Sequence, residues 1–227
     1  MIKFKKFMVE GVDDPAIFKA VFLAGGPGSG KSFIAGKTGL TSLGLKLVNS
    51  DDAFERMLKK AGMEPTPKNM FSPKGQEIRQ KAKTVTGMRQ KGYIGGRLGL
   101  VIDGTGKDFG KIQKQATALK KLGYDVAMIF VNTDLETAQR RNKMRARSLP
   151  TAAVTGMWKD VQNNLGKFQN FFNRGSEMII VDNSEESDSE GAILGAYRKM
   201  SAWVKRPPTS PAAKQWIKKE REAKRRD

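Results

Sequence analysis

The sequence of 227 residues contains no cysteine and no histidine. Without cysteine the chain can form no disulfide, no zinc–cysteine site and no thiol nucleophile, and this composition fits a cytoplasmic protein. Without histidine, any general base has to be a carboxylate, and no metal ion can have an imidazole ligand. Runs of 18 or more apolar residues are also missing, so we expect no membrane span. The first ten residues, MIKFKKFMVE, lack the apolar stretch and cleavage site of a secretion signal.

Acidic residues are few relative to basic ones. The chain has 42 Lys and Arg against 23 Asp and Glu, which gives a formal charge of +19. A surface of this sign attracts polyanions over long distances. Two interpretations therefore stay open: the surface binds nucleic acid or another polyphosphate, or the excess charge only keeps the protein soluble.

Short apolar segments alternate with longer amphipathic or polar ones along most of the chain. Strands are expected at 19–24, 45–49, 98–103, 125–132 and 178–182. Helices are expected at 31–40, 51–61, 74–91, 109–122, 135–147, 152–172 and 191–204, with a proline-rich connection at 64–73. Strands that alternate with helices form a parallel sheet covered on both faces. The pattern predicts an α/β fold of the P-loop NTPase kinase-like class, with about five parallel strands.

The amino-acid composition of the chain changes near its end. We expect a kinase-like domain over residues 1–206, with its core at 19–204, and a basic extension over 207–227. The extension begins with two prolines and continues with strong helix formers. Trp216 and Ile217 leave two alternatives open: a solvated tail, or a helix docked on the domain.

A glycine-rich segment, GGPGSGKS, follows the first expected strand and precedes a helical pattern. It matches G-x-x-x-x-G-K-[ST], whose glycines let backbone N–H groups converge on a phosphate at a helix N-terminus. Lys31 is expected to contact the β- and γ-phosphates, and the Ser32 hydroxyl to ligate Mg²⁺. The segment therefore predicts ATP and Mg²⁺ as cofactors. The residues expected to bind the nucleotide here are Gly26, Pro27, Gly28, Ser29, Gly30, Lys31 and Ser32.

Carboxylates follow the second and third expected strands. Asp51 and Asp52 come directly after the second strand, at the sheet edge where open parallel sheets bind ligands. Asp51 is the expected general base, whereas Asp52 has the alternative role of stabilising the N-terminus of the next helix. Asp103 ends the third strand and has two open roles. It can hold a water on Mg²⁺, or it can accept hydrogen bonds from the glycine-rich loop.

Five of the eight residues in 140–147, RRNKMRAR, are basic. The segment follows the fourth expected strand and has two interpretations, a solvated helix face or a kinase lid whose arginines stabilise the transferring phosphoryl group. For the lid, Arg145 and Arg147 are the expected catalytic arginines. Arg141 is expected to bind the nucleotide.

The segments GGPGSGKS, NSDD, VIDGTG, RNKMRARSLP and VDNS, in this order, resemble the zeta-toxin-like P-loop kinases. The same segments resemble the bacteriophage polynucleotide 5′-kinase domain, and the resemblance covers roughly residues 20–184. It implies that Lys31 is the phosphate-binding lysine, that Ser32 carries the magnesium-binding hydroxyl and that Asp51 is the base. It also implies the cytoplasm of a bacterial or phage-infected cell.

Two further matches concern the lid. Arg145 matches the lid arginine of the polynucleotide kinase, and Arg147 matches the arginine of the zeta-toxin lid pattern. One position departs from both relatives, which have an acceptor-binding arginine three residues after the base. This chain has Phe54 there. The departure affects the expected acceptor more than the expected chemistry of ATP.

We therefore expect an ATP- and Mg²⁺-dependent kinase that phosphorylates a hydroxyl group. The charge, the basic segment 74–91 and the basic extension favour a polynucleotide 5′-hydroxyl as acceptor. The zeta-toxin resemblance implies a small-molecule acceptor instead, a nucleotide sugar such as UDP-N-acetylglucosamine. A third alternative is a nucleic-acid- or virion-associated ATP-binding protein with little kinase turnover.

Overall fold

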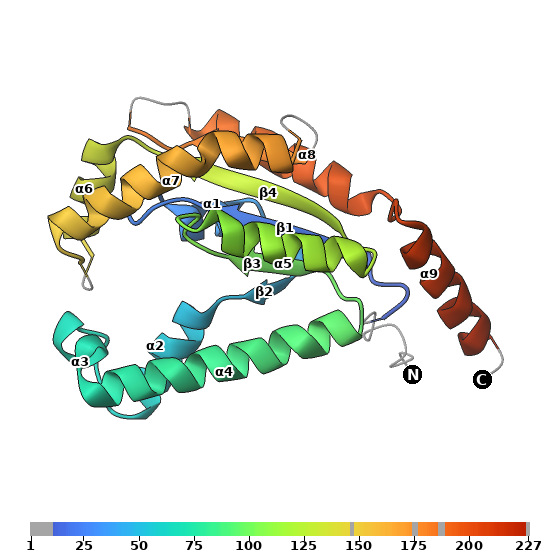
Figure 1. The fold of residues 1–227 in the computed structure, drawn as a ribbon, viewed down its shortest axis with the longest axis horizontal. Helices are drawn as coiled ribbons and strands as arrows, with labels where there is room; N and C mark the ends of the chain where they lie inside the picture. The colour runs from blue at the N-terminus through green and yellow to red at the C-terminus, as the bar shows by residue number, and fades with distance from the viewer. Residues whose placement is uncertain (1–10, 146–147, 174–176, 186–188, 226–227) are drawn as a thin grey trace, which may run out of the picture.

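The computed structural model describes residues 11–145, 148–173, 177–185 and 189–225. Its centre is a five-stranded parallel sheet with the strand order β2-β3-β1-β4-β5 (Figure 1). The strands are β1 (Lys19–Ala24), β2 (Lys46–Val48), β3 (Leu100–Asp103), β4 (Asp125–Asn132) and β5 (Met178–Asp182). The predicted α/β class and number of parallel strands are confirmed, and the predicted bounds of β1, β4 and β5 agree with the structure.

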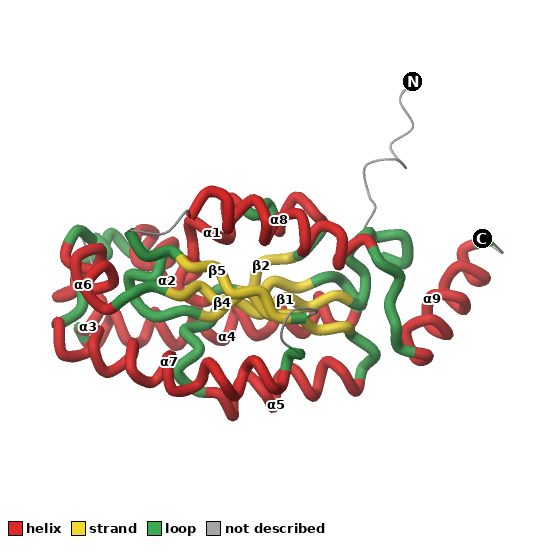
Figure 2. Tube along the Cα trace, turned by 90° about the horizontal axis from the view of Figure 1, so that it is seen from above, coloured by secondary structure: helices red, strands yellow, loops and turns green. Residues whose placement is uncertain are grey.

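Helices connect successive strands and cover both faces of the sheet. They are α1 (Lys31–Lys37), the 3-10 helix η2 (Leu40–Leu43), α2 (Ser50–Lys60), α3 (Pro67–Phe71), α4 (Pro73–Gly95), α5 (Phe109–Lys121), α6 (Leu135–Lys143), α7 (Thr151–Phe171), α8 (Ser189–Lys205) and α9 (Pro211–Lys224). Figure 2 shows α1 and α8 on one face of the sheet and α5 and α7 on the other. Within the described residues, every helix is too short or too polar to cross a membrane.

Side chains of the central strand β1 alternate between the two faces. Phe22 lies in the apolar core under α5 and α7, where its ring centroid is 5.8 Å from that of Phe172. Val21 and Leu23 lie in the second core, under α1 and α8. Because both faces are buried, β1 is apolar along almost its whole length, as expected of a central parallel strand.

Helices α2, α3 and α4 form a lobe beside the β2 edge of the sheet (Figure 1). The lobe has an apolar cluster of its own, made by Ala53, Phe54, Leu58, Met70, Ile78 and Ala82. The prediction of a connection over 64–73 was wrong, since it contains α3. The Thr66 side chain accepts from the Asn69 N–H at 3.4 Å, and Pro67 occupies the first turn, where the missing N–H has no cost. Ser72 and Pro73 start α4 in the same way.

Three other predicted helix ends were also wrong, and one of them is that of α4, which ends at Gly95 and not at residue 91. Helix α1 ends at Lys37 and not at residue 40, because Gly39 has a positive φ of 54° and the Thr38 hydroxyl donates to the Ile34 carbonyl. Helix α6 ends at Lys143 and not at residue 147. There the Asn142 carboxamide pairs with both backbone groups of Leu149, which turns the chain back on itself.

The basic extension forms α9, which packs against the amino-terminal side of the sheet. Ala213 is fully buried, and the Trp216 ring lies edge-on to Phe18 with 5.4 Å between centroids. Of the two alternatives left by the sequence, the structure favours a docked helix over a solvated tail.

Candidate active site

The glycine-rich loop joins β1 to α1 at the carboxyl edge of the sheet. Gly25, Gly28 and Gly30 have φ values of +153°, +79° and +85°, which side chains disfavour. A Cβ at Gly28 would also overlap the carbonyl oxygen of Ala138 in α6. The loop conformation therefore requires glycine for two reasons, the backbone angle and the close approach of α6.

An asparagine from the end of β5 fixes the other side of the loop. The Asn183 side chain donates to the Ser29 carbonyl at 2.8 Å, and the Asn183 carbonyl accepts from the Arg141 guanidinium at 2.7 Å. These contacts place Arg141 beside the phosphate loop, and its role in nucleotide binding stays a prediction. Asn183 was missed by the sequence analysis, although it lies in the VDNS segment.

Lys31 points back over the loop. Its ammonium group donates to the Gly25 carbonyl at 2.6 Å. Burial lowers the pKa of Lys31, while the nearby carboxylate of Asp103 acts in the opposite direction. The side chain is half-buried, and anionic ligands of the loop would stabilise its ammonium group.

Asp103 and Asn49 connect the ends of β3 and β2. The Asn49 amide donates to one carboxylate oxygen of Asp103 at 2.9 Å, and its carbonyl oxygen accepts from the backbone N–H of Asp51 at 2.7 Å. Asn49 therefore links Asp103 to the first turn of α2, another contact that the sequence analysis missed. The partner of Asp103 found here is Asn49 and not the glycine-rich loop.

The second carboxylate oxygen of Asp103, Oδ1, is buried and has no hydrogen-bond partner among the described residues. Burial raises the pKa of Asp103, and the Lys31 charge acts against this rise. No group of three or more acidic side chains that could hold a metal ion exists in the described ranges. Mg²⁺ usually uses one or two protein oxygens together with phosphates and water. The free oxygen of Asp103 and the exposed Ser32 hydroxyl fit that kind of site.

The phosphate loop opens into a cleft of about 540 Å³. The cleft brings together three of the predicted site residues, Lys31, Asp51 and Arg145. Its walls come from the loop, from α2, α3 and α4 of the lobe, and from the segment after α6. The remaining lining residues are Pro27, Pro67, Met70, Phe71, Gln76, Arg79, Thr105, Lys107, Asn142, Ser148, Leu149 and Met157.

Asp51 and Asp52 face different spaces. Asp51 lines the cleft that contains Lys31, whereas Asp52 lines a separate cavity of about 260 Å³ with Arg56 and Arg89. The backbone N–H groups of Asp51 and Asp52 both donate to the side chain of Asn49, which caps α2. The geometry therefore places Asp51, and not Asp52, in the same cleft as Lys31.

The basic segment 140–147, the candidate lid, is fixed through Asn142. Asn142 is buried, donates to the Leu149 carbonyl at 2.8 Å and accepts from the Leu149 N–H at 3.0 Å. Arg145 follows α6, is exposed and lines the cleft. Arg147, the second predicted lid arginine, lies outside the described residues.

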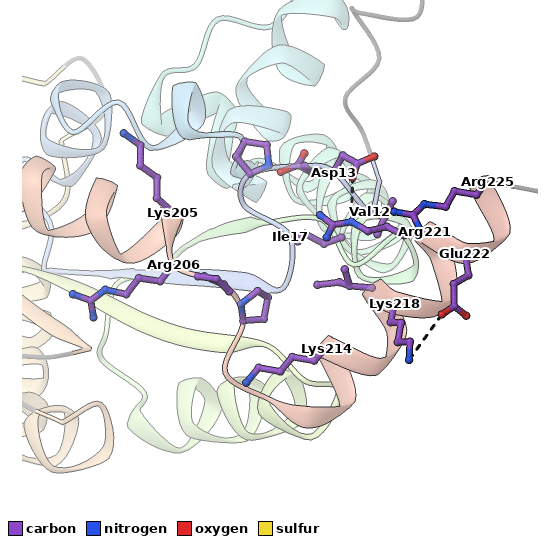
Figure 3. A pocket seen from close by; sticks show the side chains of 15 residues that line it. Val12, Asp13, Ile17, Lys205, Arg206, Lys214, Lys218, Arg221, Glu222 and Arg225 are labelled. Atoms are coloured by element: carbon purple, nitrogen blue, oxygen red, sulfur yellow. Dashed lines mark hydrogen bonds and ion pairs between the residues drawn. The ribbon is translucent and has the colours of Figure 1, made fainter.

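A second large cavity, of about 610 Å³, lies beside α9 (Figure 3). It contains six basic side chains, Lys205, Arg206, Lys214, Lys218, Arg221 and Arg225. Figure 3 shows Arg221 directed at Asp13 and Lys218 directed at Glu222, with atom separations of 3.4 and 4.0 Å. None of the predicted site residues lines this cavity.

Comparison with solved structures finds kinases and kinase-like proteins. The AvrRxo1-ORF1:-ORF2 complex with ATP matches with a TM-score of 0.60 and 15% identity, over 81% of this chain and 63% of the other. The Pnkp1/Rnl/Hen1 RNA repair complex matches with a TM-score of 0.52 and 19% identity, over 67% and 46% of the two chains. A gluconokinase from Sinorhizobium meliloti 1021 matches with a TM-score of 0.50 and 11% identity, over 83% and 94%.

These identities show the fold alone, which is that of the P-loop kinases. The chain spans 56% of the length of another AvrRxo1-ORF1:AvrRxo1-ORF2 structure, so it corresponds to part of that protein. Comparison with curated proteins gave no match. Residues 21–166, from β1 through most of α7, match a family model described as an AAA domain (AAA_33). By this match, which covers the phosphate loop and the cleft, the chain belongs to the AAA domain family AAA_33.

Proposed function

We propose that this protein is a kinase that transfers the γ-phosphoryl group of ATP to the hydroxyl of a nucleotide-type acceptor, with a polynucleotide 5′-hydroxyl as the favoured case. One observation carries the proposal: Lys31, Asp51 and Arg145, from three separate elements, line one cleft at the mouth of the phosphate loop. A phosphate-binding lysine, a carboxylate and an arginine are the groups that phosphoryl transfer to a hydroxyl requires.

The solved neighbours support the same class of reaction. A gluconokinase shares the fold, and so do a chain of an RNA repair complex and a protein crystallised with ATP. The resemblance to the zeta-toxin-like kinases and to the polynucleotide kinase adds the finer expectation of a nucleotide-type acceptor. The large positive charge of the chain favours a polynucleotide over a nucleotide sugar.

Each cleft residue has a definite task in this reaction. The acceptor hydroxyl oxygen attacks the γ-phosphorus, the bond from that phosphorus to the β–γ bridging oxygen breaks, and ADP leaves with the electron pair. Asp51 takes the proton of the hydroxyl, as a carboxylate base does in a chain without histidine. Lys31 and Arg145 stabilise the charge on the phosphoryl oxygens, since both are cations that line the cleft.

The metal ion has a place in this arrangement. Ser32 and Asp103 would hold Mg²⁺, which shields the phosphate charge when bound. The unpartnered Oδ1 of Asp103 is the observation that fits this role. Arg141, fixed through Asn183 beside the loop, would contribute to nucleotide binding.

The fate of labelled phosphate tests the proposal. The protein is incubated with ATP labelled at the γ-phosphate, Mg²⁺ and three acceptors in turn: a 5′-hydroxyl oligonucleotide, UDP-N-acetylglucosamine and gluconate. We expect label on the oligonucleotide and little label as inorganic phosphate. Label on the nucleotide sugar would support a kinase whose acceptor is a nucleotide sugar and not a polynucleotide. Binding of ATP without transfer to any of the three would contradict the proposal and support a binding protein with little turnover.

A further inference from the structure

Arg79 is a cation of the cleft with no task in the reaction as described so far. It lies on α4, in the lobe, and its guanidinium carbon lies 4.3 Å from the centroid of the Phe54 ring. Its Nε atom is buried and has no hydrogen-bond partner in the described part of the chain. A buried N–H without an acceptor is costly unless a ligand supplies one.

The surroundings of Arg79 are rigid. Phe54 beneath it is 1% exposed and belongs to the apolar cluster of the lobe. Helix α3 is fixed to α4, because the Gln76 side chain donates to the Met70 carbonyl at 2.7 Å and Gly75 packs directly on the end of α3. The guanidinium therefore lies against well-packed surroundings before any ligand binds, and such preorganisation lowers the entropic cost of binding.

The charges of the cleft point to an anionic ligand. Four basic side chains line it, Lys31, Arg79, Lys107 and Arg145, against the single carboxylate of Asp51. Among the residues that the structure describes, no carboxylate forms an ion pair with Arg79. Lys31 and Arg145 are assigned to the phosphates of ATP, so the charge of Arg79 is available to the acceptor.

An exposed aromatic ring lines the same cleft as Arg79. Phe71, at the end of α3, is 61% exposed and lines the cavity. Exposed aromatic rings provide flat surfaces on which a nucleobase can stack. The lobe thus offers a cation for a phosphate and a ring for a base within one cleft.

We propose that Arg79 binds a phosphate group of the acceptor itself, close to the hydroxyl that is phosphorylated, and that Phe71 stacks on its base. The inference rests on the proposed function and deepens it, because it names the residues that bind the acceptor. Arginine suits this task because its planar fork matches the oxygens of a phosphate. The phosphate has two sources, the 3′-phosphate of a terminal nucleotide or the diphosphate of a nucleotide sugar.

The test compares acceptors with and without a phosphate. Transfer is measured to thymidine, thymidine 3′-phosphate and UDP-N-acetylglucosamine. Whichever of the two phosphorylated acceptors has the higher kcat/KM identifies the source of the phosphate. The wild-type protein should prefer that acceptor over thymidine by about 10- to 100-fold in kcat/KM, the range expected for a charged hydrogen bond. Arg79→Met, which keeps an apolar chain over Phe54, should lose this preference while ATP affinity and transfer to thymidine stay unchanged.

Two further variants sharpen the result. Arg79→Lys should restore part of the preference, since lysine keeps the charge and lacks the planar fork. Arg198→Met removes the same charge from an exposed position on α8 and should leave the preference intact. Arg79→Met with an undiminished preference would overturn the inference.

Calorimetry separates this inference from the proposed function. Thymidine 3′-phosphate and UDP-N-acetylglucosamine are titrated into the full-length protein loaded with a non-hydrolysable ATP analogue. If either compound binds in a manner that depends on Arg79 but receives no phosphoryl group, the proposed function is contradicted and the anion site at Arg79 is supported. Equal transfer to thymidine and to both phosphorylated acceptors would overturn the inference and support the proposed function. Binding of neither compound, in a protein that binds ATP, would also overturn the inference.

Discussion

The cleft at the phosphate loop and the cavity beside α9 differ in how their charges are paired, although their lining residues carry the same formal charge. The cleft has four basic residues and one acidic residue, and the α9 cavity has six basic and three acidic residues, so each carries +3. At α9, Arg221 and Lys224 both reach Asp13, at 3.4 and 3.3 Å. In the cleft, the buried Nε of Arg79 has no partner within the described residues.

The difference shows that net charge does not locate the active site of this molecule. The ion pairs of α9 are exposed, and such pairs contribute little to stability and are screened by salt. At the carboxyl edge of the sheet, burial instead lowers the pKa of Lys31, which lines the cleft, and raises the pKa of Asp103, which lines a neighbouring cavity. Perturbed groups of this kind gather where a ligand completes the site.

The largest effect that separates the two regions is expected from their lysines. Lys31→Ala should reduce transfer to thymidine 3′-phosphate by about 10²- to 10³-fold, because it removes a fixed cation from the transferring phosphate. Lys214→Ala, the matched change at an exposed position of α9, should leave the same rate unchanged. Steady-state kinetics with saturating ATP measures both. Equal losses of transfer rate in the two variants would show that the cleft and the α9 cavity do not differ in function.

Single substitutions are better suited to α9 than removal of the whole helix. Ala213 and Trp216 belong to the packed core on the α5–α7 side of the sheet. Deletion of residues 211–227 would expose Phe18 and confuse loss of stability with loss of binding. Single substitutions therefore test the charges of α9 without this loss of packing.

A smaller effect is expected at the lid. Arg145→Ala should lower kcat by about 10- to 100-fold, since it removes a charged hydrogen bond from the transferring group. Arg145→Lys should recover part of the loss, because lysine keeps the charge and lacks the bidentate fork. Unchanged kcat in both variants would indicate that the basic segment is a solvated face, the interpretation that the sequence left open.

The sequence predicts the local parts of the site well. The glycine-rich loop is defined by adjacent residues, and the buried strand before it is apolar along its length, so both could be located from the sequence. The short helix α3 could not, because three prolines within nine residues indicate a connection, and only the caps of Thr66 and Ser72 reveal a helix there. The catalytic and metal-binding roles assigned to the site residues stay predictions.

The asparagines of the site show what sequence reasoning lacks. Asn49 contacts Asp103, 54 positions away, and Asn183 contacts Ser29, 154 positions away. No periodicity in the sequence predicts such a partner for an asparagine. Only the order of the strands in the sheet brings these strand ends together. A signal did exist, since both residues lie in the NSDD and VDNS segments that carry the family resemblance.

Arg79 could not have been predicted for the same physical reason. It reaches the cleft because α4 packs on α2, which places it over Phe54, 25 positions earlier in the chain. In the sequence it is one cation in a long basic segment. Its distinguishing property, a buried and unpartnered Nε, exists only in the folded lobe.

The central claim is that Asp51 acts on an acceptor hydroxyl within this cleft, and substitution of the two neighbouring aspartates tests it most directly. Single-turnover transfer from γ-labelled ATP is measured for the wild type, Asp51→Asn and Asp52→Asn, with ATP affinity determined in parallel. The account predicts a loss of about 10²- to 10⁴-fold for Asp51→Asn at unchanged ATP affinity, and a nearly wild-type rate for Asp52→Asn. A loss confined to Asp52→Asn, or full activity in both variants, would contradict it.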